Sequence, residues 1–420
     1  MKRLFTFITL LYALTVGSRA LAQVAYVGHS HIRTCRVVAN GDVFAPPVIK
    51  LDEGEQIELS FDELSHQYHR YQYTLTHCNA DWTPSSLPEN EYLEGFNDNP
   101  IEDYAVSFNT TMPYTHYRLT LPNEDVRLKL SGNYLVNVYD TDADDPTRPV
   151  LTTGFSVLDQ QVSVSAQVST NTDIDHNLSH QQVSFSIAHR GYTIRNPQTE
   201  LKPVVRQNNR MDNQVTDLRP SYISTDCITY EHNHALIFKA GNEYRRFETV
   251  STRYLPLGVE DLRLHAPYYH ATLYTAQPRT ANYIYDQDQD GHYLIRYDQA
   301  QDQDTEADYF FVHFSLSCPE PLAGGDLYLQ GAFTGGRFDE STRLSYDPAT
   351  RTYQTVQLLK QGAYNYLYLF LPDGSDRGST TQVEGDFHQT ENEYLILIYH
   401  RPFGLRYDKL IGMQRVKYEP

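Results

Sequence analysis

Apolar and polar residues alternate through most of this chain, and that alternation limits the folds available to it. Residues 69–76, 117–121 and 134–139 alternate with a period of two. Because successive side chains of a β-strand point to opposite faces, each run places one face on a core and the other in solvent. Turn signals such as Leu121-Pro122-Asn123 separate the runs. We therefore expect an all-β protein of tandem immunoglobulin-like or early-set β-sandwich domains with antiparallel sheets.

The same patterning predicts three β-rich domains and very little helix. We place the domains at residues 23–158, 159–300 and 301–420, from the strand runs and the turn signals between them. One short helix fits residues 86–95.

Two local patterns refine this expectation. Residues 283–285 and 293–297 flank a tight Asp-Gly turn and predict a β-hairpin. The third domain, with strand runs at 309–316 and 361–369 around a Gly-Ala-Phe loop, resembles the early-set immunoglobulin-like modules appended to glucan-handling enzymes. The chain also has 34 tyrosines beside a single tryptophan. Tyrosine suits a pleated, half-buried sheet, so we expect much aromatic surface.

The first 22 residues predict a signal peptide. Lys2 and Arg3 precede an apolar stretch at 4–16, and Ala20-Leu21-Ala22 supplies the small residues that a cleavage site needs. Cleavage there leaves 398 residues and takes the net charge from −19 to −22, because three basic residues are removed. No later stretch approaches the roughly 18–20 apolar residues of a membrane helix. We expect an exported protein that does not insert in a membrane and whose negative charge repels nucleic acid.

The cysteines are widely spaced and form no C-x-x-C motif, which argues against a zinc ribbon or a thioredoxin-type site. They are Cys35, Cys78, Cys227 and Cys318. In an oxidising compartment one or two disulfides are compatible with this count, and the spacing does not say which cysteines would pair.

Two patterns resemble metal ligands, and neither completes a site. Asp286, Asp288 and Asp290 begin like a calcium loop, but position 12 is Tyr297 where an EF-hand needs a carboxylate, and the flanks are strands. We therefore interpret the run as a turn. The histidine pairs lack a converging third ligand, so no metal is expected there. The pairs are His29 and His31, His66 and His69, and His232 and His234.

No catalytic centre is predicted. The G-x-S-x-G nucleophile elbow, H-E-x-x-H and phosphate-binding glycine loops are absent from the sequence. His77 and Cys78 are neighbours in a strand and point to opposite faces, so they cannot share a proton. We expect a protein that is not an enzyme and holds no cofactor.

A set of short blocks lies in order along nearly the whole mature chain. The blocks are His77–Leu87, Glu91–Phe96, Ile101–Thr110, Tyr114–Asn123, Ser131–Tyr134, Ala240–Glu248, Ala307–Phe314 and Arg401–Gly412. Each block alone is weak, and the ordered set is specific. Together these blocks resemble the plug-protein family of the type IX secretion system of Bacteroidetes.

The resemblance implies a periplasmic protein, monomeric when free, that docks on the periplasmic mouth of the giant outer-membrane translocon barrel. There it would block the pore while no substrate passes. The candidates for contact with this partner are aromatic and arginine side chains of the resembling blocks, the types that dominate interface energy. They are Trp82, Tyr92, Phe96, Arg245 and Arg246. For each, packing within the protein is the competing interpretation.

The alternative function is a periplasmic carbohydrate-binding β-sandwich protein, which the early-set-like third domain and the many tyrosines suggest. Glycan platforms need exposed aromatic rings. The loop at 331–336 carries Phe333 and no tryptophan, which weakens this alternative.

Overall fold

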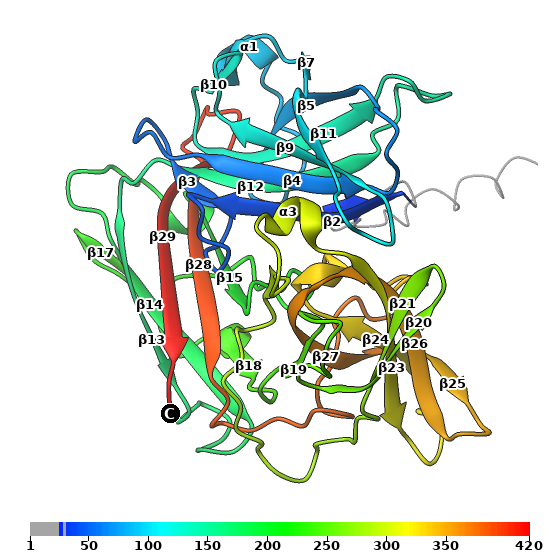
Figure 1. The fold of residues 1–420 in the computed structure, drawn as a ribbon. Helices are drawn as coiled ribbons and strands as arrows, with labels where there is room; N and C mark the ends of the chain where they lie inside the picture. The colour runs from blue at the N-terminus through cyan, green and yellow to red at the C-terminus, as the bar shows by residue number, and fades with distance from the viewer. Residues whose placement is uncertain (1–24, 28–30) are drawn as a thin grey trace, which may run out of the picture.

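The computed structural model describes residues 25–27 and 31–420 and is all-β, which confirms the expected fold class (Figure 1). The predicted signal peptide lies outside the described residues. Within them, no helix is long and apolar enough to cross a membrane. Sheet pairing and three hydrophobic cores group the strands into three β-sandwiches, which we call the first, second and third sandwich.

The first sandwich packs two sheets around one core. In β5, inward-facing Tyr71, Tyr73 and Leu75 are buried and the residues between them are half-buried, as the period-two pattern predicts. One sheet has the order β1-β12-β11-β5-β7, with β3 beside β12, and the other β2-β4-β9-β8. The first sheet contains β1 (Ala25–Val27), β3 (Val48–Lys50), β5 (Tyr71–Cys78), β7 (Asn99–Pro100), β11 (Gly132–Asp140) and β12 (Leu151–Leu158). The other contains β2 (Ile32–Ala39), β4 (Ile57–Glu63), β8 (Asp103–Val106) and β9 (Thr115–Leu121).

The predicted short helix near residue 90 is present as α1 (Glu89–Tyr92), which confirms that expectation. It leads into β6 (Leu93–Gly95), which pairs with β10 (Val126–Leu128) at one end of the first sandwich.

The second sandwich contains the strands that directly follow the first sandwich together with the last two strands of the chain. One sheet has β13 (Ser163–Ser169), β14 (His180–Ala188), β16 (Tyr222–Ile223), β17 (Cys227–Tyr230) and β18 (Ile237–Lys239). The facing sheet has β15 (Leu201–Gln207), β28 (Asn392–His400) and β29 (Lys409–Tyr418). The turns α2 (Pro197–Glu200) and η1 (His234–Leu236) border it.

The third sandwich lies between those two segments in the chain. Its larger sheet has β20 (Val259–His265), β21 (Tyr268–Leu273), β23 (Tyr309–Ser317), β25 (Ser345–Asp347) and β26 (Thr352–Lys360). Across the core lie β19 (Arg245–Glu248), β22 (Tyr293–Ile295), β24 (Gly325–Gln330) and β27 (Gly362–Pro372). The single turns α3 (Gln303–Glu306) and η2 (Ala332–Thr334) complete it.

The strand pairing crosses the boundary expected at residue 300. β28 and β29 come last in the chain, yet β28 pairs with β15, and Tyr394, Ile396 and Ile398 belong to the core of the second sandwich. We therefore propose a nested organisation, in which residues 241–389 form a third domain inserted into the second.

The predicted hairpin around the Asp-Gly turn is wrong. Residues 283–285 form no strand, and β22 pairs with β27 instead. Contacts with distant residues replace the local ladder: the Tyr283 hydroxyl donates to Glu243 Oε1 at 2.5 Å, and the amide of Gln289 donates to Asn365 Oδ1 at 2.5 Å.

Tyrosine fills the cores to a degree that the sequence did not indicate. Among the described residues, ten of the twelve largest side chains that are almost completely buried are tyrosines. A buried hydroxyl is expected to bond a group inside the protein, and that of Tyr230 is an exception without a partner among these residues. The Tyr134 hydroxyl donates to the Leu130 carbonyl at 2.8 Å, and the Tyr399 hydroxyl donates to Asn133 Oδ1 at 2.7 Å. The second of these bonds joins β28 to the first sandwich.

Candidate functional site

Buried charged groups lie where the sandwiches meet. Among the residues that the structure describes, no group of three or more histidine, cysteine or acidic side chains is arranged to hold a metal ion. Ion pairs with a buried member form three polar junctions, one for each pair of sandwiches.

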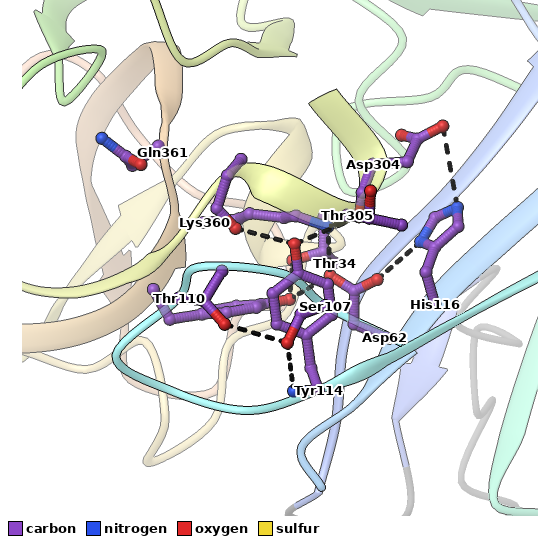
Figure 2. A network of polar contacts seen from close by, with 12 residues as sticks. Thr34, Asp62, Ser107, Thr110, Tyr114, His116, Asp304, Thr305, Lys360 and Gln361 are labelled. Carbon is purple, nitrogen blue, oxygen red and sulfur yellow. Dashed lines mark hydrogen bonds and ion pairs between the residues drawn. The ribbon is translucent and has the colours of Figure 1, made fainter. Parts of the chain in front are cut away.

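The first junction, which we call the Asp62 junction, joins the first and third sandwiches (Figure 2). Asp62 on β4 is fully buried and its two carboxylate oxygens meet three partners. His116 Nδ1 lies 2.6 Å from Oδ1, while Lys360 Nζ at 2.7 Å and the Tyr309 hydroxyl at 2.6 Å contact Oδ2. His116 comes from β9, beside β4, whereas Tyr309 and Lys360 come from β23 and β26 of the third sandwich.

The charge balance at this junction holds Asp62 ionised. Burial alone would raise the pKa of Asp62, but Lys360 and His116 outweigh it and hold the pKa below its ordinary value. Lys360 is 1% exposed; its Nζ also donates to the Asp304 carbonyl at 2.7 Å and lies 4.2 Å from the centre of the Tyr114 ring. Lys360 is thus enclosed by a carboxylate, a carbonyl and a ring face, which satisfies its charge without water.

Two further aspartates extend the Asp62 junction. Asp304 in α3 accepts from Arg36 at 2.8 Å and from Arg118 at 3.1 Å, both from the first sandwich. Asp308 accepts from the backbone amides of Thr111 at 2.7 Å and Met112 at 3.1 Å, in the loop between β8 and β9. Aspartates of the third sandwich therefore bond both side chains and backbone amides of the first.

The Asp408 junction joins the first and second sandwiches and brings two family-like blocks together. Asp408, whose side chain is almost completely buried, accepts from the Ala80 amide at 3.0 Å and forms ion pairs with Lys202 at 3.0 Å and Arg401 at 2.7 Å. The Tyr407 ring packs edge-on against His77 at 5.2 Å. Residues 77–82 and 401–409, far apart in the chain, thus form one contact.

The second and third sandwiches meet at a loop-to-loop contact. Asp212 pairs with buried Arg210 at 2.6 Å and also accepts from the Gly378 amide at 3.0 Å. Arg377 donates to the carbonyls of Asn213 at 3.2 Å and Gln214 at 3.3 Å. Each pair of sandwiches is therefore connected by specific polar contacts.

Of the five predicted interface residues, two are buried inside the protein. Trp82 is 4% exposed, with its ring so close to Gly154 that a Cβ there would lie 2.4 Å from Trp82 Cζ3. Tyr92 is buried, and its hydroxyl donates to the Leu75 carbonyl at 3.2 Å. Phe96, by contrast, is 83% exposed.

The two arginines serve internal contacts. Arg245 pairs with fully buried Glu384 at 3.0 Å, and Arg279 approaches the same carboxylate at 2.6 Å. Burial opposes ionisation of Glu384, but the two arginines hold its pKa below the ordinary value. Arg246 is half-buried and pairs with Asp286 at 2.5 Å. Phe96 is therefore the exposed member of the predicted set.

The three aspartates of the calcium-like run turn to different partners. Asp286 pairs with Arg246, and Asp290 pairs with Lys417 at 2.9 Å. Asp288 accepts from the backbone amides of Tyr244 and Asp290. The three carboxylates do not converge on one point. The segment is a turn whose aspartates bond separate partners.

The cysteines and histidines do not form the arrangements that their sequence positions left open. Cys35, Cys78, Cys227 and Cys318 are free thiols in the described chain. His66 bonds Ser107, His69 bonds Asp140, and His232 bonds Asp173. A histidine cluster does form, but from separate strands: His270 Nδ1 lies 2.8 Å from His313 Nε2, and His265 packs on His270. His270 and His313 are 43 positions apart in the chain, and no local spacing identifies the cluster.

Two carboxyls, one on the buried Glu243 and one on the partly buried Asp288 of the calcium-like run, favour protonation. Burial raises the pKa of Glu243 to about 8 and that of Asp288 to about 7, with neighbouring carboxylates adding to the effect. Glu243 accepts from the Tyr283 hydroxyl and from the Glu391 amide at 3.1 Å.

Lys360→Met should lower the free energy of unfolding by about 3–5 kcal/mol, because it leaves the Asp62 carboxylate buried without its cation. Urea unfolding followed by circular dichroism measures this. The double variant Asp62→Asn/Lys360→Met should recover a large part of the loss, and the exposed Lys50→Met should change stability by less than about 1 kcal/mol. An effect of Lys360→Met as small as that of Lys50→Met would contradict the role of the pair.

Glu243→Gln should make stability less dependent on pH between about pH 5 and 8. A carboxyl with a raised pKa in the folded chain contributes stability that is fully present below its ordinary pKa and is lost as the pH rises through the folded value, about 8 for Glu243. The measurement is the difference between urea midpoints at pH 5.5 and pH 8. The exposed Glu260→Gln should leave that difference unchanged, and an unchanged difference in Glu243→Gln would refute the assignment.

Comparisons with known proteins agree with the ordered blocks. The family model for the type 9 secretion system plug protein first domain matches residues 32–159, the range of the first sandwich. A crystal structure of a hypothetical protein from Parabacteroides merdae ATCC 43184 is 48% identical, covers 94% of this chain and 99% of its own, and superposes with a TM-score of 0.92. No curated protein matches. The chain belongs to the plug-protein family of the type IX secretion system.

Proposed function

We propose that this protein docks as a rigid body on the periplasmic mouth of the giant outer-membrane translocon barrel of the type IX secretion system. There it blocks the pore while no substrate passes. Its place is the periplasm, it is a monomer when free, and it performs no catalysis. Membership of the plug family supports the role in secretion, and the buried Asp62–Lys360 pair between two sandwiches is the observation that supports a rigid blocking body.

The physical requirement on such a plug is size and stiffness. A pore that passes folded cargo also passes a single small β-sandwich, or a string of sandwiches on flexible linkers. Inter-domain contacts that are small and polar at the surface permit relative motion, whereas fully desolvated, mutually satisfied charges permit one arrangement. Three sandwiches held by such junctions resist being threaded one at a time.

We place the docking face at the end of the first sandwich that carries Phe96. Phe403, in the β28–β29 loop, is 98% exposed, and that loop lies against the first sandwich (Figure 1). The Arg406–Glu91 ion pair links the two segments, three residues from Phe403 and five from Phe96. Both rings belong to family-like blocks, and large exposed aromatic side chains supply binding energy when a partner buries them.

Affinity purification tests the partner directly. The tagged protein should recover one very large β-barrel protein from gently solubilised envelopes, as identified by mass spectrometry. Deletion of the protein should raise the permeability of the envelope to large molecules. Recovery of no such barrel under several mild detergents would refute docking.

Phe96→Ser/Phe403→Ser should weaken capture of the barrel by about 2 kcal/mol or more in binding free energy, since it removes two exposed aromatic anchors. The urea midpoint should stay within error of the wild type, because both side chains are exposed. Leu264→Ser, at an exposed position of the third sandwich, is the matched control and should capture the barrel normally. Normal capture by the double variant would place the docking face elsewhere.

The carbohydrate alternative gains no support from the loop that suggested it. Phe333 packs edge-on against Tyr364 at 5.3 Å and lies against the core of the third sandwich, so it presents no flat ring to a sugar.

A further inference from the structure

A cavity of about 580 Å³ lies where the three sandwiches meet. Its walls come from β2 and the loop at 43–48, from β15 and β28, and from the third-sandwich loops at 290–293 and 330–338. The volume is within the range of small-molecule binding pockets, about 300–1,000 Å³. It is separate from the docking face proposed above, and its argument does not rest on the plug function.

One wall carries a buried cation without a counter-ion. Arg206 on β15 is 6% exposed, and its Nε donates to Gln214 Oε1 at 3.3 Å. No carboxylate of the described chain forms an ion pair with its guanidinium, and burial lowers the pKa of Arg206. An isolated buried charge is strongly unfavourable, so a guanidinium in this position is suited to an anion that enters with the ligand.

The other charges at the cavity are already balanced. Arg36 pairs with Asp304 at 2.8 Å and Arg210 with Asp212 at 2.6 Å. Asp290 pairs with Lys417 at 2.9 Å. Asp376 lies exposed at the rim, where water solvates it. The uncompensated charge inside the cavity is therefore the positive charge of Arg206.

Unpaired hydrogen-bond donors point to the same ligand chemistry. Trp82 Nε1 and Arg36 Nε are buried, and neither has a partner among the residues described. Both residues line the cavity. Apolar side chains, among them Leu395 and Leu397, supply the remaining wall. Buried polar groups nearly always find partners in native proteins, so these donors mark where a ligand's oxygens belong.

We propose that the cavity binds a small organic anion. Its carboxylate or phosphate group pairs with Arg206 and accepts a hydrogen bond from Trp82 Nε1, and its apolar part packs against Leu395 and Leu397. A charge-assisted bond of this kind in a desolvated pocket contributes more than a bond between neutral groups.

The single tryptophan of the chain reports on the cavity directly. Titration of the purified protein with decanoate, decyl phosphate and decanol, followed by Trp82 fluorescence, should give a saturable change with one or both anions. Decanol should bind about tenfold more weakly or worse. The headgroup that binds tighter identifies the class of the natural ligand. No saturable change with either anion, or binding of decanol equal to that of the anions, would overturn the proposal.

Arg206→Gln should reduce anion affinity by about ten- to hundredfold, since it removes a charged hydrogen-bond partner. Arg190→Gln, at an exposed residue of the same sandwich, should bind as the wild type does. Arg206→Gln also removes an unpaired buried charge, so its thermal midpoint without ligand should equal or exceed that of the wild type. Wild-type affinity in Arg206→Gln would refute the site. If that variant does not fold, Arg206→Lys, which keeps the charge but loses the planar fork, should bind more weakly than the wild type and serves as the same test.

Discussion

The buried ion pair between Asp62 and Lys360 sets how the first sandwich sits on the third. Both charges are buried and each contacts the other across the boundary between the two sandwiches. A shift of one sandwich by the width of a water molecule would leave both charges desolvated and apart, at a cost of several kcal/mol. The pair therefore acts less as a source of net stability than as a restriction on geometry.

The other two junctions impose the same kind of restriction. Asp408 accepts a hydrogen bond from the Ala80 amide of the first sandwich and pairs with cations of the second. Asp212 accepts a hydrogen bond from the Gly378 amide of the third sandwich. Contacts of this type form only when both segments of the chain are in the matching position, whereas apolar surfaces tolerate sliding. Some of the family-like blocks contribute to these contacts: residues 77–87 and 401–412 meet at the Asp408 junction, and Tyr309 of the block 307–314 donates to Asp62. The nested chain path adds to this, because the third sandwich is tethered to the second at both of its ends.

The fold class was predictable from local patterns, whereas its assembly was not. Alternation in residues 71–75 predicts which side chains of β5 face the core, since it depends only on the pleat of a strand. The pairing of β28 with β15 joins residues almost two hundred positions apart, and nothing in either strand's own pattern names its partner. The Asp-Gly turn near residue 290 failed as a hairpin signal for the same reason, because distant residues compete for that segment.

The same limit applies to the site residues: local sequence patterns do not show which of them are buried in the assembled fold. Aromatic and arginine side chains of the family-like blocks were reasonable interface candidates. Trp82 and Tyr92 are buried, the two arginines form ion pairs within the protein, and of the five only Phe96 is strongly exposed. Asp62, Lys360 and Arg206 carry no motif. Their importance comes from burial and from neighbours in other sandwiches, which only the assembled structure reveals.

The rigidity of the assembly can be measured as a distance distribution between the first and third sandwiches. Spin labels at the exposed positions Glu124 and Asp373, in a chain with its cysteines replaced, report this distance by pulsed electron paramagnetic resonance. A single narrow distribution in the free protein is the result that the account predicts. A broad or multiple distribution would show that the sandwiches move relative to one another, and would contradict a plug that blocks a pore as one rigid body.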